Sequence, residues 1–301
     1  MASPSNRANR ADSADTSHGG ADTALRGLTE DGAFRVMVVQ TTETVRGAIA
    51  AQHVHGHVAR LFAEMLTGSI LVRETMSPEL RVQGILQGGD GKSRIIADVH
   101  PGGDTRGLVQ LAPGKADIVL DHNARMQMMR TLHDGSLHQG VVSVPKGGGV
   151  SGALMQYMQA SEQVTSVIAV GCVMSENNVI AAGGYIVQLL PELAEGPLAL
   201  MTERLTAFES IDSLLARGAA APATLLDELL YGIPYARVGE SPLRFHCPCS
   251  EARVAASLAT LPRADVESLL VAGQMLDIQC DYCGREYQIA PETLRGLLSS
   301  N

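Results

Sequence analysis

The sequence has no Trp, and aromatic residues make up only 3% of its 301 residues. Proteins that bind single-stranded nucleic acid stack bases on aromatic side chains, and this chain has few to offer. Lysine is equally scarce, at Lys92, Lys115 and Lys146, and the formal net charge is −9. Because excess positive charge holds proteins on phosphate backbones, we expect no nucleic-acid partner.

Long apolar runs are also missing. No run approaches the roughly 20 residues that a membrane helix needs, and residues 1–27 lack the apolar stretch of a signal peptide. We therefore expect a cytoplasmic protein that is not inserted in a membrane. An apolar fraction of 45% is nevertheless enough to build a hydrophobic core.

The chain contains only five cysteines. Because the cytosol keeps thiols reduced, metal binding or redox chemistry explains them better than a disulfide framework does. Four of them lie near the C-terminus, whereas Cys172 stands alone in the apolar segment from Val167 to Val173. We predict that Cys172 is a buried, small hydrophobic residue outside the chemistry of the protein.

The first part of the chain predicts a tail and a mixed core. Residues 1–27 are rich in Ser, Ala, Asn and Asp without periodicity, so we expect a disordered tail. From Phe34 the residues alternate as in a strand, and a helix is predicted from Thr41 or Thr42 to Leu66. Further strands are predicted over 80–86, 93–99, 107–111, 140–144, 164–174 and 179–190, with a helix over 150–161. Residues 28–191 are thus predicted to form an α+β core with a predominantly antiparallel sheet.

The second part predicts a linker and a small domain. Residues 192–240 carry leucines at helical spacing, interrupted between Gly218 and Pro222, and we predict a helical linker that needs a neighbour to cover it. The folded C-terminal domain, residues 241–301, is the neighbour that we expect. This domain has five Arg and no Lys against seven Asp plus Glu. A nucleic-acid-binding zinc ribbon is normally basic, so this balance disfavours that role.

The C-terminal cysteines form two close pairs, Cys247-Pro-Cys249 and Cys280-Asp-Tyr-Cys283. Two pairs presented by two turns are typical of a tetrahedral four-thiolate zinc site. Soft thiolates in this geometry exclude magnesium and calcium, and leave iron as the competitor. We predict that Cys247, Cys249, Cys280 and Cys283 bind Zn²⁺.

The motif alone leaves the role of this metal open, because four-cysteine zinc most often stabilises a domain too small to bury a core. The C-x-C spacing of the first pair indicates a further use. Cysteines two residues apart lie about 6.6 Å apart in an extended chain, so a disulfide between them would be strained and readily reduced. Zinc-bound thiolates are also the form that peroxide or hypochlorous acid attacks. These properties suit a reversible switch.

Histidines provide weaker candidates for metal binding. His53, His55 and His57 alternate, and on one helix His53 and His57 would share a face. No acidic third ligand accompanies them, so we expect surface histidines. His246 is next to Cys247, and we expect an incidental neighbour there.

Two other polar motifs do not predict catalysis. The segment from Lys146 to Gly152 lacks the residue order of a phosphate loop and fits a glycine turn between a strand and a helix. The segment Ser161-Glu162-Gln163 fits a structural role, because no motif ties a histidine to it. We find no catalytic triad, dinucleotide fold or ATP site, and we expect a protein that is not an enzyme.

The cysteine pairs in their setting, Phe245 to Ser250 and Leu276 to Tyr287, closely resemble the redox-regulated heat-shock chaperones of the 33 kDa chaperonin family. The likeness extends upstream to the segments 42–66, 161–164 and 181–191, and covers roughly residues 30 to 290. His138 departs from it, because the family often has an aromatic residue there, and the N-terminal tail is an addition. Neither difference touches the cysteines.

The resemblance implies an ATP-independent holdase that is inactive as a reduced, zinc-bound monomer. It also implies that oxidation forms disulfides within each pair, Cys247 with Cys249 and Cys280 with Cys283, that zinc is released, and that the linker unfolds. Active homodimers would then bind unfolding client proteins.

Two alternatives stay open at this point. One is a zinc-ribbon adaptor or nucleic-acid module with a structural zinc, which the acidic charge and the tight C-x-C disfavour. The other is a thiol oxidoreductase, which lacks the expected βαβ context around Cys280 and Cys283.

Overall fold

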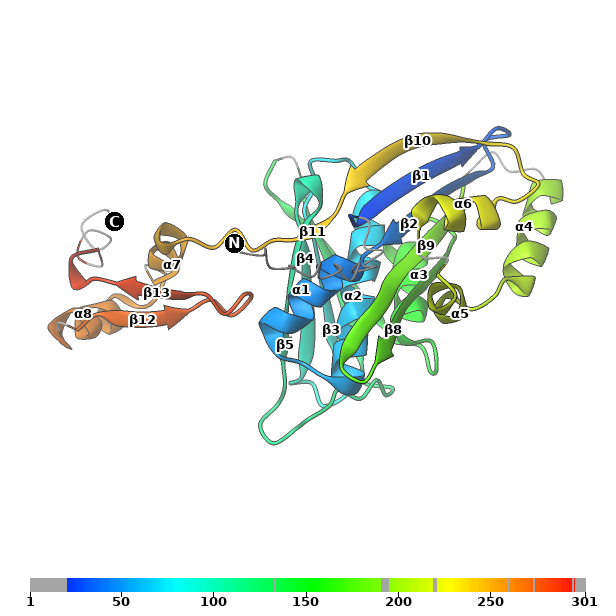
Figure 1. Ribbon diagram of the computed structural model, residues 1–301. Coiled ribbons are helices and arrows are strands. Elements are labelled where there is room, and N and C mark those ends of the chain that lie inside the picture. Colours follow the sequence, from blue (N-terminus) through cyan, green and yellow to red (C-terminus); the bar gives the residue numbers. More distant parts are fainter. Residues whose placement is uncertain are drawn as a thin grey trace, which may run out of the picture.

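A computed structural model describes residues 21–132, 134–190, 195–218, 221–258, 260–272, 274–293 and 295. The main body contains two sheets with a layer of helices between them, and a smaller C-terminal unit projects from one end (Figure 1). The architecture is α+β with antiparallel sheets, which confirms the predicted fold class.

The first sheet has five strands in the order β10-β1-β2-β9-β8, and each neighbouring pair is antiparallel. Helices cover both of its faces. In β2, Met37 and Val39 face the helices between the sheets, whereas Val36 and Val38 face the outer helices, which explains the unbroken apolar run. The strands are β1 (Thr23–Thr29), β2 (Phe34–Gln40), β8 (Ser166–Ser175), β9 (Asn178–Leu189) and β10 (Tyr235–Pro242).

The second sheet has six strands in the order β11-β5-β4-β3-β6-β7. Its pairs are antiparallel except for the short parallel pair of β11 with β5. The strands are β3 (Val82–Gln87), β4 (Arg94–Val99), β5 (Asp104–Gln110), β6 (Arg125–Thr131), β7 (Leu137–Ser143) and β11 (Arg244–Phe245). A 3₁₀ turn, η1 (Pro101–Gly103), joins β4 to β5.

Three helices lie against the inner faces of the sheets: α1 (Thr42–Gln52), α2 (Gly56–Glu74) and α3 (Gly149–Ser161). Helix α2 contacts strands of both sheets and is buried along most of its length. The single helix predicted up to Leu66 is wrong, because His53 has a left-handed backbone (φ 51°) that ends α1. Among the described residues, no helix is long and apolar enough to cross a membrane.

Three outer helices, α4 (Glu195–Ala207), α5 (Ile211–Ala216) and α6 (Pro222–Leu229), cover the other face of the five-stranded sheet. Their buried leucines pack against Phe34, Val36 and Val38. The helices predicted in the linker are present, but the neighbour that covers them is this sheet. The C-terminal unit lies at the opposite end of the molecule (Figure 1).

Two strands correct the predicted segment boundaries. Residues 23–27, assigned to a disordered tail, lie in β1, and β10 begins within the predicted linker and crosses its predicted end at residue 240. The two strands pair with each other along their whole length, so each supplies the backbone partners that the other needs. Neither has a strong apolar alternation, and β10 is mostly exposed. The tail prediction for residues 1–20 lies outside the described residues. Strand β6 was also not predicted.

The C-terminal unit consists of α7 (Glu251–Leu258), α8 (Arg263–Ala272) and a hairpin of β12 (Leu276–Gln279) and β13 (Glu286–Ile289). Its core is small. Among its described residues, the buried hydrophobic side chains are Ala255, Val266 and Ile289, with partly buried residues around them. So small a core indicates that the unit depends on another source of stability.

Candidate metal centre

Two turns bring the cysteines together. Cys247 and Cys249 lie directly after β11, and Cys280 and Cys283 lie in the turn between β12 and β13. The second turn is closed by hydrogen bonds from the Cys280 amide to the Arg285 carbonyl (2.9 Å) and from the Gly284 amide to the Cys280 carbonyl (2.8 Å). Gly284 has φ +70°, a conformation that side chains disfavour, so glycine suits this position.

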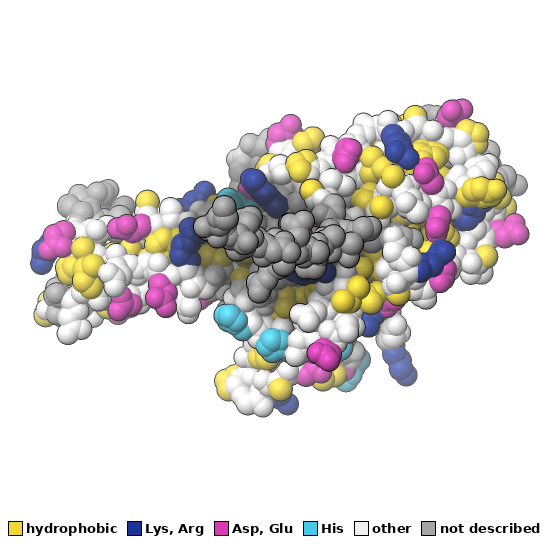
Figure 2. Space-filling model, viewed as in Figure 1, with side chains coloured by type: hydrophobic (Ala, Val, Ile, Leu, Met, Phe, Trp, Pro, Cys, Tyr) yellow, Lys and Arg dark blue, Asp and Glu magenta, His cyan; other side chains and the backbone are white. Residues whose placement is uncertain are grey.

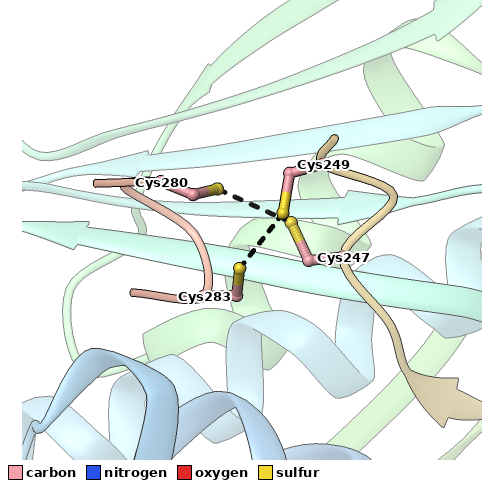
Figure 3. Close-up of side chains that lie close together, drawn as sticks. All are labelled: Cys247, Cys249, Cys280 and Cys283. Atoms are coloured by element: carbon pink, nitrogen blue, oxygen red, sulfur yellow. Dashed lines mark hydrogen bonds between the residues drawn. The ribbon is translucent and has the colours of Figure 1, made fainter. Parts of the chain in front are cut away.

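All four side chains point toward one centre (Figure 3). The Sγ atoms of Cys247 and Cys280 are 3.8 Å apart, those of Cys249 and Cys283 are 3.3 Å apart, and all four lie within 4.8 Å of one another. Four sulfurs placed tetrahedrally at about 2.3 Å from a zinc ion lie about 3.8 Å from each other. The four thiols therefore fit a single metal ion. They are also the only cluster of potential ligands of this kind in the described part of the chain.

The surroundings of the cluster affect its protonation. Burial, and then the hydrogen bonds of the neighbouring thiols, raise the pKa of Cys283 to about 12. The Tyr287 hydroxyl donates a hydrogen bond to Cys249 Sγ (3.0 Å). A cation at the centre would reverse the pKa shift, because a coordinating thiol is deprotonated. The arrangement is thus suited to thiolates held by a metal.

Small molecules have access to the sulfurs. A pocket of about 310 Å³ is lined by Cys247, Cys249 and Cys283 together with the side chains of neighbouring residues, and all four cysteines are only partly buried. An oxidant of the size of peroxide can enter such a space, since one water molecule occupies about 30 Å³.

The six-stranded sheet and helix α1 hold the cluster through side chains that the sequence did not indicate. Arg106 on β5 donates to Cys247 Sγ (3.5 Å), and its Cζ lies 4.0 Å from the centroid of the Tyr282 ring. Gln52 at the end of α1 donates to the carbonyls of Asp281 (2.7 Å) and Tyr282 (3.0 Å). No local motif predicts these contacts, because the partners are far apart in the chain.

The isolated cysteine is buried as the sequence suggested, whereas His246, expected to be an incidental neighbour, contacts β5. Cys172 is on β8 inside the main core with no exposed surface, and burial raises its pKa to about 12. His246 Nδ1 is 3.0 Å from Asp104 Oδ2, and the His246 amide donates to the Thr105 carbonyl (2.9 Å). These contacts attach the first cysteine pair to β5.

The other polar motifs have structural roles. His53 and His55 occupy the ends of α1 and α2, so His53 and His57 do not share a helix, and His57 contacts Asp117 (2.8 Å). Gly147 and Gly148 lie in the turn between β7 and α3, and Gly149 begins α3. Glu162 accepts hydrogen bonds from the Tyr157 hydroxyl (2.6 Å) and Arg130 (2.7 Å).

Comparison with known proteins places this architecture in one family. The sequence model described as Hsp33 protein matches residues 22–290. The 33 kDa chaperonin of Syntrophotalea carbinolica is 27% identical over 92% of this chain and 99% of its own length. The 33 kDa chaperonin of Bacillus subtilis is 26% identical over 92% of this chain and 98% of its own.

A solved structure shares the fold. The crystal structure of the 33 kDa chaperonin from Thermotoga maritima superimposes with a TM-score of 0.78, covering 93% of this chain and 99% of that one at 20% identity. The family match spans most of the residues, and both relatives named above are 33 kDa chaperonins. The chain therefore belongs to the Hsp33 protein family.

Proposed function

We propose that this chaperone is a redox-regulated, ATP-independent holdase, and that Cys247, Cys249, Cys280 and Cys283 are its switch. The observation that carries the proposal is the convergence of four partly buried thiols in a unit with almost no core of its own. A unit of this kind folds or unfolds with the state of its thiols.

Zn²⁺ is the cofactor that we propose for the four cysteines. When bound, it would keep the sulfurs as nucleophilic thiolates and supply folding free energy to the unit. The donor set supports zinc, since four soft sulfurs in a near-tetrahedral arrangement are its usual structural site.

Oxidation would convert the four thiols into two disulfides. Formation of each disulfide joins two sulfurs by one S–S bond and releases two electrons and two protons. One molecule of hydrogen peroxide accepts them and becomes two water molecules. We propose the pairs Cys247 with Cys249 and Cys280 with Cys283, as the family resemblance implies. The short Sγ distances of the reduced cluster run across the pairs, so cross-pair disulfides are the alternative that peptide mapping distinguishes. Either pairing leaves no thiolate to hold a cation.

Unfolding of the C-terminal unit would affect the outer helices through the segment of chain that connects the two. The segment runs from α6 through β10 and β11 directly into Cys247. Strand β11 is only two residues long, and β10 is an edge strand with mostly exposed side chains. Once β11 is released, little side-chain packing keeps β10 on the sheet.

The surface that we propose for clients lies under α4, α5 and α6. Helices α5 and α6 are shorter than the about 12 to 15 residues that an isolated helix needs for stability. Their departure would uncover the apolar face around Phe34, Val36 and Val187. Figure 2 shows hydrophobic side chains already reaching the surface at this end of the molecule, between charged ones. Large apolar patches bind unfolded chains.

This mechanism divides the chain into working parts. We propose that the α+β core within 28–191 binds clients and forms an active homodimer, that 192–240 is the releasable linker, and that 241–301 is the redox switch. We also propose that the protein acts in the cytoplasm, without nucleic-acid or membrane partners and without an enzymatic activity.

The test measures zinc release and suppression of client aggregation together, before and after peroxide at mildly elevated temperature. We expect one zinc per reduced chain, release on oxidation, and suppression only afterwards. Cys249→Ser should lose zinc, whereas the control Cys172→Ala should behave as the wild type. Zinc that stays bound through oxidation, or suppression that does not change, would favour a purely structural metal.

Hydrogen exchange tests the route of release. Oxidised protein should lose protection in β10 and in α4 to α6, while β8 and β9 stay protected. Equal protection of the outer helices in both states, with normal zinc release, would refute this route.

A further inference from the structure

Arg106 occupies the junction between the main body and the cysteine cluster. It lies on β5, and its side chain is only 16% exposed. One side of the guanidinium faces the sheet, where its Nε donates to Asp98 Oδ2 (2.9 Å). The other contacts belong to the C-terminal part of the chain. Arg106 therefore joins two regions that are far apart in the sequence.

On the sheet side of this junction, Asp98 holds the Arg106 guanidinium in place. Asp98 on β4 has no exposed surface. It also accepts hydrogen bonds from Arg81 (2.6 and 2.8 Å) and is hydrogen-bonded to His100 (3.2 Å). Burial by itself would raise the pKa of Asp98, but the hydrogen bonds from His100 and Arg81 lower it well below its usual range. Asp98 is thus an anion at neutral pH, and it fixes the direction of the Arg106 side chain.

The other side of the guanidinium touches both halves of the cluster. Its Nη1 donates to Cys247 Sγ (3.5 Å), which belongs to the first cysteine pair. Its Cζ stacks over the ring of Tyr282 at 4.0 Å, and Tyr282 lies between the cysteines of the second pair. One side chain therefore positions both pairs against the same strand.

The charge of Arg106 suits this position. Four thiolates around a divalent cation carry a net charge of −2, and Arg106 places a positive charge beside one of them in a partly buried setting. A hydrogen bond from a charged donor to a ligand atom orients that ligand and stabilises its ionised form.

We propose that Arg106 is a positioning residue of the metal centre, which joins its two cysteine pairs to each other and to the six-stranded sheet. The inference rests on the proposed zinc site and adds a residue from outside the cysteine motif. Through Arg106, a change in the cluster would act directly on β5 and, through Asp98, on β4.

The test compares zinc affinity of the reduced full-length chain by competition with a chromophoric chelator. Arg106→Gln should weaken zinc binding about 10- to 100-fold, the range typical of residues that support metal ligands. Arg106→Lys should recover part of the loss, because it keeps the charge. Arg94→Gln is the matched control, since Arg94 is an exposed arginine at the other end of β4, where it contacts Gln110. Its affinity should equal that of the wild type.

Cobalt-substituted protein gives a readout that a general loss of stability does not produce. A positive charge beside Cys247 lowers the energy of the sulfur electrons, so Arg106→Gln should shift the sulfur-to-cobalt charge-transfer band to longer wavelength. Arg106→Lys should leave the band near its original position. Because Arg106→Gln can also loosen the sheet, Tyr282→Leu serves as a second variant that leaves Asp98 and Arg106 in place. Loss of the cation–π contact should weaken zinc binding about two- to fivefold.

Wild-type affinity together with an unshifted cobalt band in Arg106→Gln would overturn the inference while leaving the zinc site intact. A wild-type protein that binds neither zinc nor cobalt would instead overturn the proposed function, and this inference with it.

Discussion

Removing the proposed zinc ion from the reduced protein should unfold the C-terminal unit and leave the central strands of both sheets folded. The perturbation is a strong chelator added in the presence of a thiol reductant, so that no disulfide forms. This separates the loss of the cation from the oxidation of the sulfurs.

The size of the effect follows from the packing of the unit. Its described residues include two large buried hydrophobic side chains, Val266 and Ile289, and burying each of them stabilises a fold by about 1.5 to 3 kcal/mol. A four-thiolate zinc site supplies about 10 to 16 kcal/mol in small zinc domains. Without it, the folded state of the unit should no longer be the populated one.

Hydrogen exchange followed by mass spectrometry measures this directly. Amides of the β12–β13 hairpin should exchange at the rate of an unfolded chain after chelation, whereas the β8–β9 hairpin should keep its protection. Re-addition of zinc should restore the hairpin. A β12–β13 hairpin that stays protected in the metal-free, reduced protein would refute the argument, because the small core would then be sufficient.

Three further substitutions test separate parts of the structure. Leu226→Ala on α6 should lower the free energy of unfolding by about 2 to 5 kcal/mol and make the reduced protein suppress aggregation without oxidant, whereas Leu200→Ala, at a 46% exposed position, should do neither. Asp98→Asn should cost about 3 kcal/mol in denaturant unfolding at neutral pH. Because the folded pKa of Asp98 is lowered, the wild type should lose this advantage as the pH falls below about 4; an equal difference at all pH values would contradict the charge argument. Cys172→Ala should cost about 1 kcal/mol and leave zinc content and oxidant response unchanged, and a lost response would give Cys172 a role in the switch.

The sequence by itself determined the features that depend on neighbours in the chain. The spacing of the two cysteine pairs was enough to predict a four-thiol cluster, because each turn presents its own pair. The apolar runs around Val167 and Val187 predicted β8 and β9, and they also placed Cys172 in the core. Local patterns of this kind predict which residues are buried, and they do so without identifying the residues that bury them.

Only the tertiary structure decided what depends on pairing across the chain. Strands β1 and β10 carry little apolar alternation and stabilise each other, although they are over 200 residues apart in the chain. They pair from Thr23 with Pro242 to Thr29 with Tyr235. The outer helices could not be assigned to their sheet, since leucine spacing indicates a buried face but not the surface that buries it. Arg106 shows the same limit for the site: its contacts with Cys247 and Tyr282 exist only because the fold brings both cysteine turns to the β4–β5 hairpin, where Asp98 holds Arg106.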